Sequence, residues 1–102
     1  MDEIERTRAT PAGWLIGVLL RPPGEPLQRH YYAVGQADRA RAEWAAVDCA
    51  IRAGEVATSP QQGQEPVEAL RPLTRPRMAL LGLATGQVRE LGWRYPRRWL
   101  TG

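Results

Sequence analysis

The sequence has 102 residues and a formal net charge of +3, and 43% of its residues are apolar while 25% are charged. This length and composition are typical of one folded domain rather than of a disordered chain. A single cysteine excludes an intramolecular disulfide, and with a single histidine it leaves no basis for a His/Cys metal site. We therefore expect no bound metal and no cofactor.

All fourteen basic residues are arginine. Two explanations fit this composition. One is the coding bias of a GC-rich, bacterial-like genome, which raises the frequency of Arg, Ala, Gly and Pro together. The other is selection for the planar guanidinium group, which makes paired contacts with phosphates and carboxylates.

Most of the first eleven residues are charged or polar, and Ile4 is the only branched apolar residue among them. This pattern predicts a flexible N-terminal tail over residues 1–11 and differs from that of a signal peptide. The longest apolar run, Trp14 to Leu20, is far shorter than the roughly 20 residues that cross a bilayer as a helix. We expect a cytoplasmic protein with no membrane span, in which residues 12–102 form a single domain.

Two short apolar or aromatic segments precede the longest uninterrupted helical pattern. Residues 14–20 predict a central strand because both of their faces are apolar. Three prolines within residues 21–26 predict a connecting loop, and residues 27–34 predict a second strand. Since residues 36–53 contain seven alanines and neither proline nor glycine, they predict a long helix. The chain is therefore expected to begin with a ββα unit.

The predicted helix carries one apolar stripe, formed by Ala40, Trp44, Val47 and Ile51 at helical spacing. We expect this stripe to lie on the hairpin and to form part of the core. Truncation of Trp44 to alanine would then cost about 3–5 kcal/mol. The other predicted core residues are Trp14, Ile16, Val18, Leu20, Tyr32, Val34, Leu80, Leu81, Leu83 and Leu91.

A second face of the same helix carries only small side chains, namely those of Ala42, Ala45, Ala46 and Cys49. Small side chains allow another backbone to approach closely, so this face is a candidate packing surface for a second copy or for the shorter second helix. Alanine also favours helix formation by itself, which explains the same pattern without any partner.

The second half of the chain predicts shorter elements. Residues 54–66 are polar and rich in turn-forming residues, which predicts a mobile loop, and Val67–Arg71 predicts a third strand. Thr74 is a suitable cap for a helix over residues 75–81 that ends at Gly82, and residues 88–95 predict a last strand. The expected fold is α+β: a small, mainly antiparallel sheet of two to four strands, packed on one long helix, with a short second helix.

No group of residues indicates an enzyme. Cys49 and His30 are the only candidate nucleophile and base, and Cys49 lies near the C-terminal end of its helix, where the helix dipole disfavours a thiolate. We expect a structural thiol and a histidine without a catalytic role. The sequence also lacks a phosphate-binding glycine motif.

The C-terminal segment is the strongest candidate for a binding site. It interleaves arginines with aromatic rings, and its predicted partner-binding residues are Trp93, Arg94, Tyr95, Arg97, Arg98 and Trp99. Such a segment suits a protein partner, single-stranded nucleic acid, or a membrane surface. The alternative is that its rings cover the core and its arginines are solvated. Our leading expectation is a non-enzymatic module that binds another protein or itself, as a homodimer for example, with single-stranded nucleic-acid binding as the alternative function.

Overall fold

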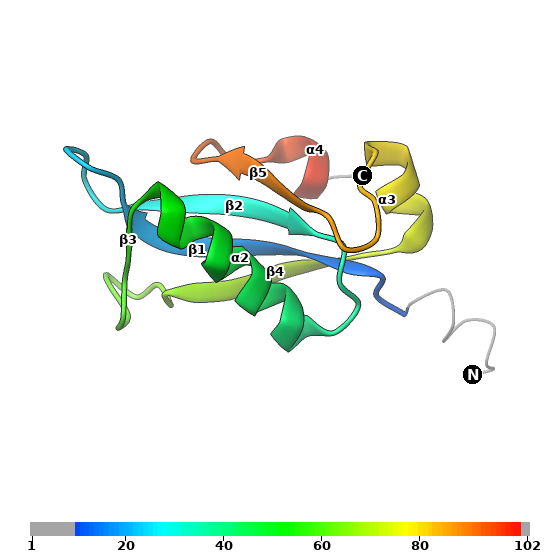
Figure 1. Cartoon of the computed structure of the whole chain (residues 1–102), viewed down its shortest axis with the longest axis horizontal. Coiled ribbons are helices and arrows are strands. Elements are labelled where there is room, and N and C mark those ends of the chain that lie inside the picture. The colour runs from blue at the N-terminus through cyan, green and yellow to red at the C-terminus, as the bar shows by residue number, and fades with distance from the viewer. Residues whose placement is uncertain (1–9, 101–102) are drawn as a thin grey trace.

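The computed structural model describes residues 10–100 and confirms the α+β class (Figure 1). Five antiparallel strands form one sheet, with α2 on one face and α3 and α4 on the other. The tail predicted over residues 1–11 lies almost wholly outside the described residues. The elements, in chain order, are β1 (Gly13–Arg21), β2 (Gln28–Val34), α2 (Arg39–Ala53), β3 (Glu55–Val56), β4 (Val67–Leu73), α3 (Arg75–Leu81), β5 (Val88–Gly92) and α4 (Arg97–Leu100).

Strand β1 is the centre of the sheet, as its uniformly apolar sequence predicts. It pairs with β2 on one side and with both β4 and the two-residue β3 on the other, and β5 pairs with the outer edge of β2. Ile16 lies opposite Tyr32 in the β1–β2 register, whereas Leu15 lies opposite Ala33. Because successive side chains point to opposite faces of a strand, β1 supplies large apolar residues to both faces.

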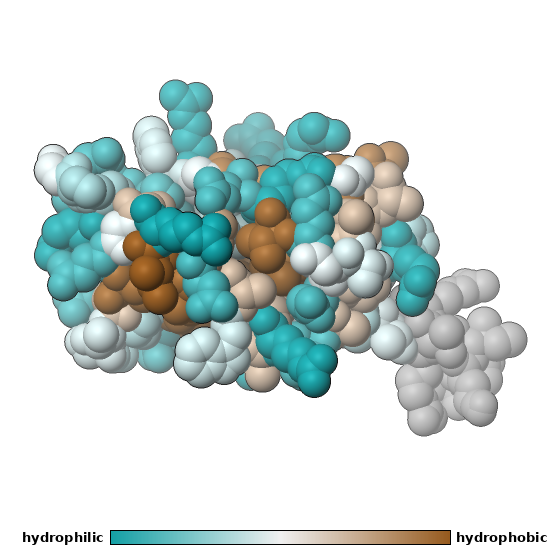
Figure 2. Space-filling model, viewed as in Figure 1, coloured by the Kyte–Doolittle hydropathy of each residue, from teal (hydrophilic) through white to brown (hydrophobic). Residues whose placement is uncertain are grey.

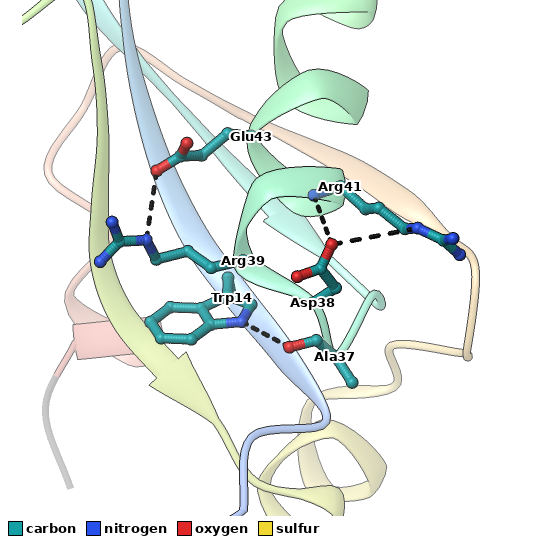
Figure 3. Close-up of polar contacts among 6 residues, drawn as sticks. All are labelled: Trp14, Ala37, Asp38, Arg39, Arg41 and Glu43. Atoms are coloured by element: carbon teal, nitrogen blue, oxygen red, sulfur yellow. Dashed lines mark hydrogen bonds and ion pairs between the residues drawn. The ribbon is translucent and has the colours of Figure 1, made fainter.

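Helix α2 begins beside the N-terminal end of β1 (Figure 3). The carboxylate of its N-cap residue, Asp38, accepts a hydrogen bond from the backbone N–H of Arg41 and satisfies one of the amides left free in the first turn. The indole N–H of Trp14 donates to the carbonyl of Ala37 at 2.9 Å. These two contacts fix the start of the helix over β1.

The face that α2 turns to the sheet is the small-residue face and not the predicted stripe. Ala42, Ala46 and Ala50 are fully buried against a layer of large sheet residues, and Ala45 and Cys49 pack at its border. That sheet layer consists of Ile16, Val18, Leu20, Tyr32 and Val34. The prediction that the stripe forms core is therefore wrong, because bulky sheet side chains fill the space between the layers and leave room only for methyl groups from the helix.

A second core cluster lies on the opposite face of the sheet, beneath α3 and α4. It contains Leu15, Ala33, Leu73, Met78, Leu83 and Trp99. Helix α3 has the predicted limits: Thr74 caps it through the amide of Arg77, and Gly82 ends it in the left-handed conformation. Leu80 is exposed, so its predicted place in the core is wrong.

The segment between α2 and β4 contains more regular structure than expected. Residues Glu55 and Val56 form β3, and Gln61 and Gln64 pair with each other across a tight turn. The predicted third strand is present and extends to Leu73, whereas the last strand ends earlier than predicted, at Gly92. Helix α4 was not predicted.

Candidate functional site

An apolar surface runs along the outside of α2. Trp44 is 70% exposed and Ile51 is 59% exposed, and Val47 lies between them and is half-buried. With Ala40, these residues form the stripe that the sequence shows at helical spacing, and we call it the apolar strip. Since α2 buries alanines and exposes its largest side chains, its amphipathic pattern is the reverse of what core packing alone produces.

A groove lies beside the apolar strip, on the side of α2 that faces β3 and β4. It has a volume of about 350 Å³ and is lined by Glu43, Trp44, Val47, Val56, Ala57 and Val67. Figure 2 shows the surrounding surface, where apolar side chains gather beside α2 and next to β3. The strip and the groove together form one continuous apolar surface, of the kind that marks interaction sites on soluble domains.

Both outer strands of the sheet carry an irregularity. The β1–β4 register shifts between Leu15 and Ile16, and the β2–β5 register shifts between Tyr31 and Tyr32. Strand β4 also contains Pro72, which has no backbone N–H to donate. Bulges and prolines protect a sheet edge from pairing with another chain. A partner is therefore more easily accommodated on the faces of this domain than at its edges.

Arginines gather on the opposite side of the sheet, on and around α3 and α4. Residues 69–100 contain seven arginines but a single carboxylate, Glu90, which accepts a hydrogen bond from Cys49 on α2 at 2.9 Å. We call the following set the arginine face: Arg71, Arg75, Arg77, Arg89, Arg94, Arg97 and Arg98. The positive charge of this face is therefore barely offset by residues near it in the sequence.

The two ends of the predicted C-terminal site have different environments. Trp93 is 59% exposed and Tyr95 is 65% exposed, whereas Trp99 is buried in the second core cluster. The guanidinium of Arg94 lies over the Trp93 ring at 5.5 Å, and Tyr95 meets Tyr31 edge to face at 6.4 Å. Trp99 thus anchors α4 to the core, and Trp93 and Tyr95 remain available on the surface.

Several arginines of this face are oriented by backbone carbonyls. Arg71 donates to the carbonyl of Leu100, and Arg89 donates to those of Leu81 and Gly82 at 2.8 and 2.5 Å. Arg89 also lies over the ring of Trp99 at 5.8 Å. A carbonyl oxygen orients a guanidinium without cancelling its charge, so these contacts hold positive charge in fixed positions.

Three arginines elsewhere in the described chain have carboxylate partners. Arg29 pairs with Glu68 at 2.8 Å, Arg39 with Glu43 at 3.6 Å, and Arg41 with Asp38 at 3.9 Å. By contrast, no ion pair within residues 10–100 involves any of Arg71, Arg75, Arg89, Arg94 or Arg98. These five arginines therefore carry charge that no carboxylate of the described chain neutralises through an ion pair.

The candidate nucleophile is placed where it is unreactive. Burial and the hydrogen bond to Glu90 raise the pKa of the Cys49 thiol to about 11, which keeps it protonated at neutral pH. Burial also lowers the pKa of His30, whose ring bonds to the Gln28 side chain rather than to Cys49. Among residues 10–100, no three His, Cys, Asp or Glu side chains are grouped so that they could hold a metal ion.

The structure separates the two sets of predicted site residues. Ala42 and Ala46 contact the chain's own sheet, so a second copy cannot reach them. The C-terminal set stays together, with Trp99 inside and the other five residues exposed. The apolar strip was not identified as a surface from the sequence, because its residues were assigned to the core. The signal that could have shown it was the face of alanines, which offered the helix a second way to pack on the sheet.

Comparison of the sequence with protein-family models and with curated proteins, and of the fold with solved structures, finds no match. In the part of the chain that the structure describes, the helices are too short or too polar to cross a membrane.

Proposed function

We propose that this chain is a non-enzymatic interaction domain that self-associates through the apolar strip and groove on α2. The observation that carries the proposal is the reversed helix, which buries Ala42, Ala46 and Ala50 and exposes Trp44 and Ile51. An exposed tryptophan on a rigid helix adds nothing to the core but is the residue type most enriched at the centres of protein interfaces.

A second copy is the occupant that best fits this surface. A two-fold axis brings the same patch of both copies together, and apolar surface is complementary to itself. The groove of about 350 Å³ beside Trp44 can accept a large side chain from the facing copy. Trp44 and Ile51 lie seven residues apart, which is about two turns of the helix. In an antiparallel pair of α2 helices, Trp44 of one copy therefore lies near Ile51 of the other.

The charged residue that lines the groove does not oppose this contact. Glu43 lines the groove but is paired with Arg39 within the same helix. This ion pair within each copy offsets the charge of the carboxylate that lines the groove. Filling the groove therefore does not require burial of an unpaired Glu43 carboxylate.

Light scattering coupled to size-exclusion chromatography tests the proposal. The wild-type chain is expected to show a mass that rises toward that of a dimer with protein concentration, and Trp44→Glu is expected to be monomeric. Loss of a central interface tryptophan weakens association by roughly 30-fold or more, equivalent to about 2 kcal/mol.

Trp93→Glu is the matched control, because Trp93 is similarly exposed but belongs to the segment between β5 and α4 rather than to α2. It should associate like the wild type. A wild-type chain that remains monomeric at its highest attainable concentration would rule out self-association. Equal weakening by Trp44→Glu and Trp93→Glu would show that the contact does not use the apolar strip.

A further inference from the structure

The arginine face has a combination of features that the proposed self-association does not use. Its charge is concentrated, its guanidinium groups are partly held in place by backbone carbonyls, and two aromatic rings stand on its surface. It lies across the sheet from α2, so it remains accessible when the apolar strip is covered.

The positive charge of this face favours an anionic partner. Seven arginines occur between residues 69 and 100 with only Glu90 to offset them, and Glu90 is directed to Cys49. A guanidinium group presents several N–H donors in a plane, and phosphate oxygens accept them in pairs. Since five of these arginines form no ion pair within the described chain, an incoming phosphate displaces no internal carboxylate from them.

The aromatic rings narrow the choice among anions. Trp93 and Tyr95 are more than half exposed, and neither ring fills a pocket of the domain. Rings exposed beside arginines can stack on nucleic-acid bases, and they reach bases only where these are not already stacked in a duplex. Arg94 over the Trp93 ring extends the same flat surface with a charged group.

We propose that the arginine face is a binding site for single-stranded nucleic acid, with phosphates bound by Arg94, Arg97 and Arg98 and bases stacked on Trp93 and Tyr95. An acidic protein is the competing type of partner. Its side chains also pair with arginine, but they do not need exposed rings two residues apart along the chain.

The test measures binding of the full chain to a short fluorescein-labelled oligothymidylate by fluorescence anisotropy at several salt concentrations. The logarithm of the affinity should fall linearly with the logarithm of salt concentration, with a slope of about −0.7 for each phosphate contacted. For three contacts this corresponds to a loss of roughly 20-fold between 50 and 200 mM salt.

Two variants separate the contributions of charge and stacking. Arg97→Ala combined with Arg98→Ala should make the slope less negative by about 1.4, since two phosphate contacts are lost. Trp93→Ala should weaken binding roughly tenfold at fixed salt while leaving the slope unchanged. The matched control is Arg21→Ala combined with Arg52→Ala, which removes two exposed arginines outside the arginine face and should have little effect.

Four outcomes would contradict the proposal. The first is no binding at low salt, and the second is an equal loss of binding in the control and in Arg97→Ala/Arg98→Ala. The third is binding of a poly-glutamate peptide as tightly as the oligothymidylate, with Trp93→Ala unaffected for both ligands. That result would assign the face to an acidic protein partner. Preference for a duplex of the same length would likewise contradict the role of the rings.

Discussion

Cys49 illustrates how one contact decides the chemistry of a residue. Its thiol lies between α2 and β5 and donates a hydrogen bond to Glu90 at 2.9 Å. Partial burial removes water that would stabilise a thiolate, and the negative charge of Glu90 disfavours it further, so the pKa rises from 9.0 to about 11. The neighbouring Tyr32 hydroxyl is affected in the same direction, and its pKa rises to about 12.

Alkylation of Cys49 by iodoacetamide is therefore expected to be slow at pH 8 and to accelerate only as the pH approaches 11. A raised thiol pKa means that the protonated form dominates below it, and only the thiolate reacts. Glu90→Gln removes the negative charge and should increase the rate at pH 9 several-fold. The measurement is the mass-spectrometric rate of modification, with the urea-unfolded chain as the control. Equal rates in the folded and unfolded chains at pH 8 would show that the thiol is not protected.

Gly17 has a role that is set by a neighbouring side chain. It lies in the middle of β1, and a Cβ atom at this position would come within 3.0 Å of the Arg29 Cδ. The absence of a side chain lets Arg29 lie across β1 from β2 and reach Glu68 on β4 at 2.8 Å. A single glycine thus permits an ion pair that spans three strands.

At the scale of elements, α2 owes its position to the size of its side chains. The sheet beneath it is built from large residues such as Ile16, Leu20 and Tyr32, and these fill most of the space between the layers. The face of α2 with the smallest side chains therefore packs closest. Trp44 cannot replace Ala46 in that space, so the bulky side chains are left on the outside.

This arrangement predicts opposite sensitivities for two residues of α2. Ala46→Leu should destabilise the domain by about 1–3 kcal/mol, because added volume must be accommodated in a packed layer. Trp44→Ala should change the stability of the monomer by less than about 0.5 kcal/mol, as expected for an exposed site. Both are measured by urea unfolding at concentrations below self-association, since association stabilises the folded chain. A decrease of several kcal/mol in the free energy of unfolding of Trp44→Ala would show instead that the apolar strip is part of the core.

The elements themselves were largely predictable from the sequence, but their orientation was not. Thr74, Pro76 and Gly82 define α3 through local chemistry, and the apolar run from Trp14 to Leu20 defines β1. Local signals of this kind depend only on neighbouring residues. The face of α2 that meets the sheet is decided by the volume of side chains elsewhere in the chain. Hydrophobic periodicity predicts burial of Trp44 in preference to alanine, because it takes no account of the space available.

The candidate site was predictable only in part for a similar reason. The interleaving of Arg94, Tyr95 and Arg97 was visible in the sequence, and these residues are exposed as a binding segment requires. Trp99 is buried and Trp93 is not because the short helix α4 places Trp99 in the core cluster that contains Leu15 and Leu73. Four residues carry too little periodicity for such a helix to be predicted.

At the scale of the whole molecule, the sheet separates two surfaces of different chemistry. One side presents the apolar strip of α2, beside which Glu43 is paired with Arg39. The other presents the arginine face, five of whose arginines form no ion pair within the described chain, and two exposed rings. If both proposals hold, a dimer formed through α2 carries two arginine faces directed away from its interface.

The two surfaces also account for the four tryptophans, each of which has a different environment. Trp14 is half-buried and bonded to Ala37, and Trp99 is buried in the second core cluster. Trp44 is exposed on α2, and Trp93 is exposed in the segment between β5 and α4. The indole N–H groups therefore report separately on the core, the apolar strip and the arginine face.

The most direct test is the nuclear magnetic resonance spectrum of the four indole N–H groups at increasing protein concentration, with a soluble paramagnetic probe in the solvent. In dilute solution the probe should broaden the signals of Trp44 and Trp93 but not that of Trp99. As concentration rises, the Trp44 signal alone should become protected. Protection of Trp44 at every concentration would place it in the core, and exposure at every concentration would contradict self-association through α2.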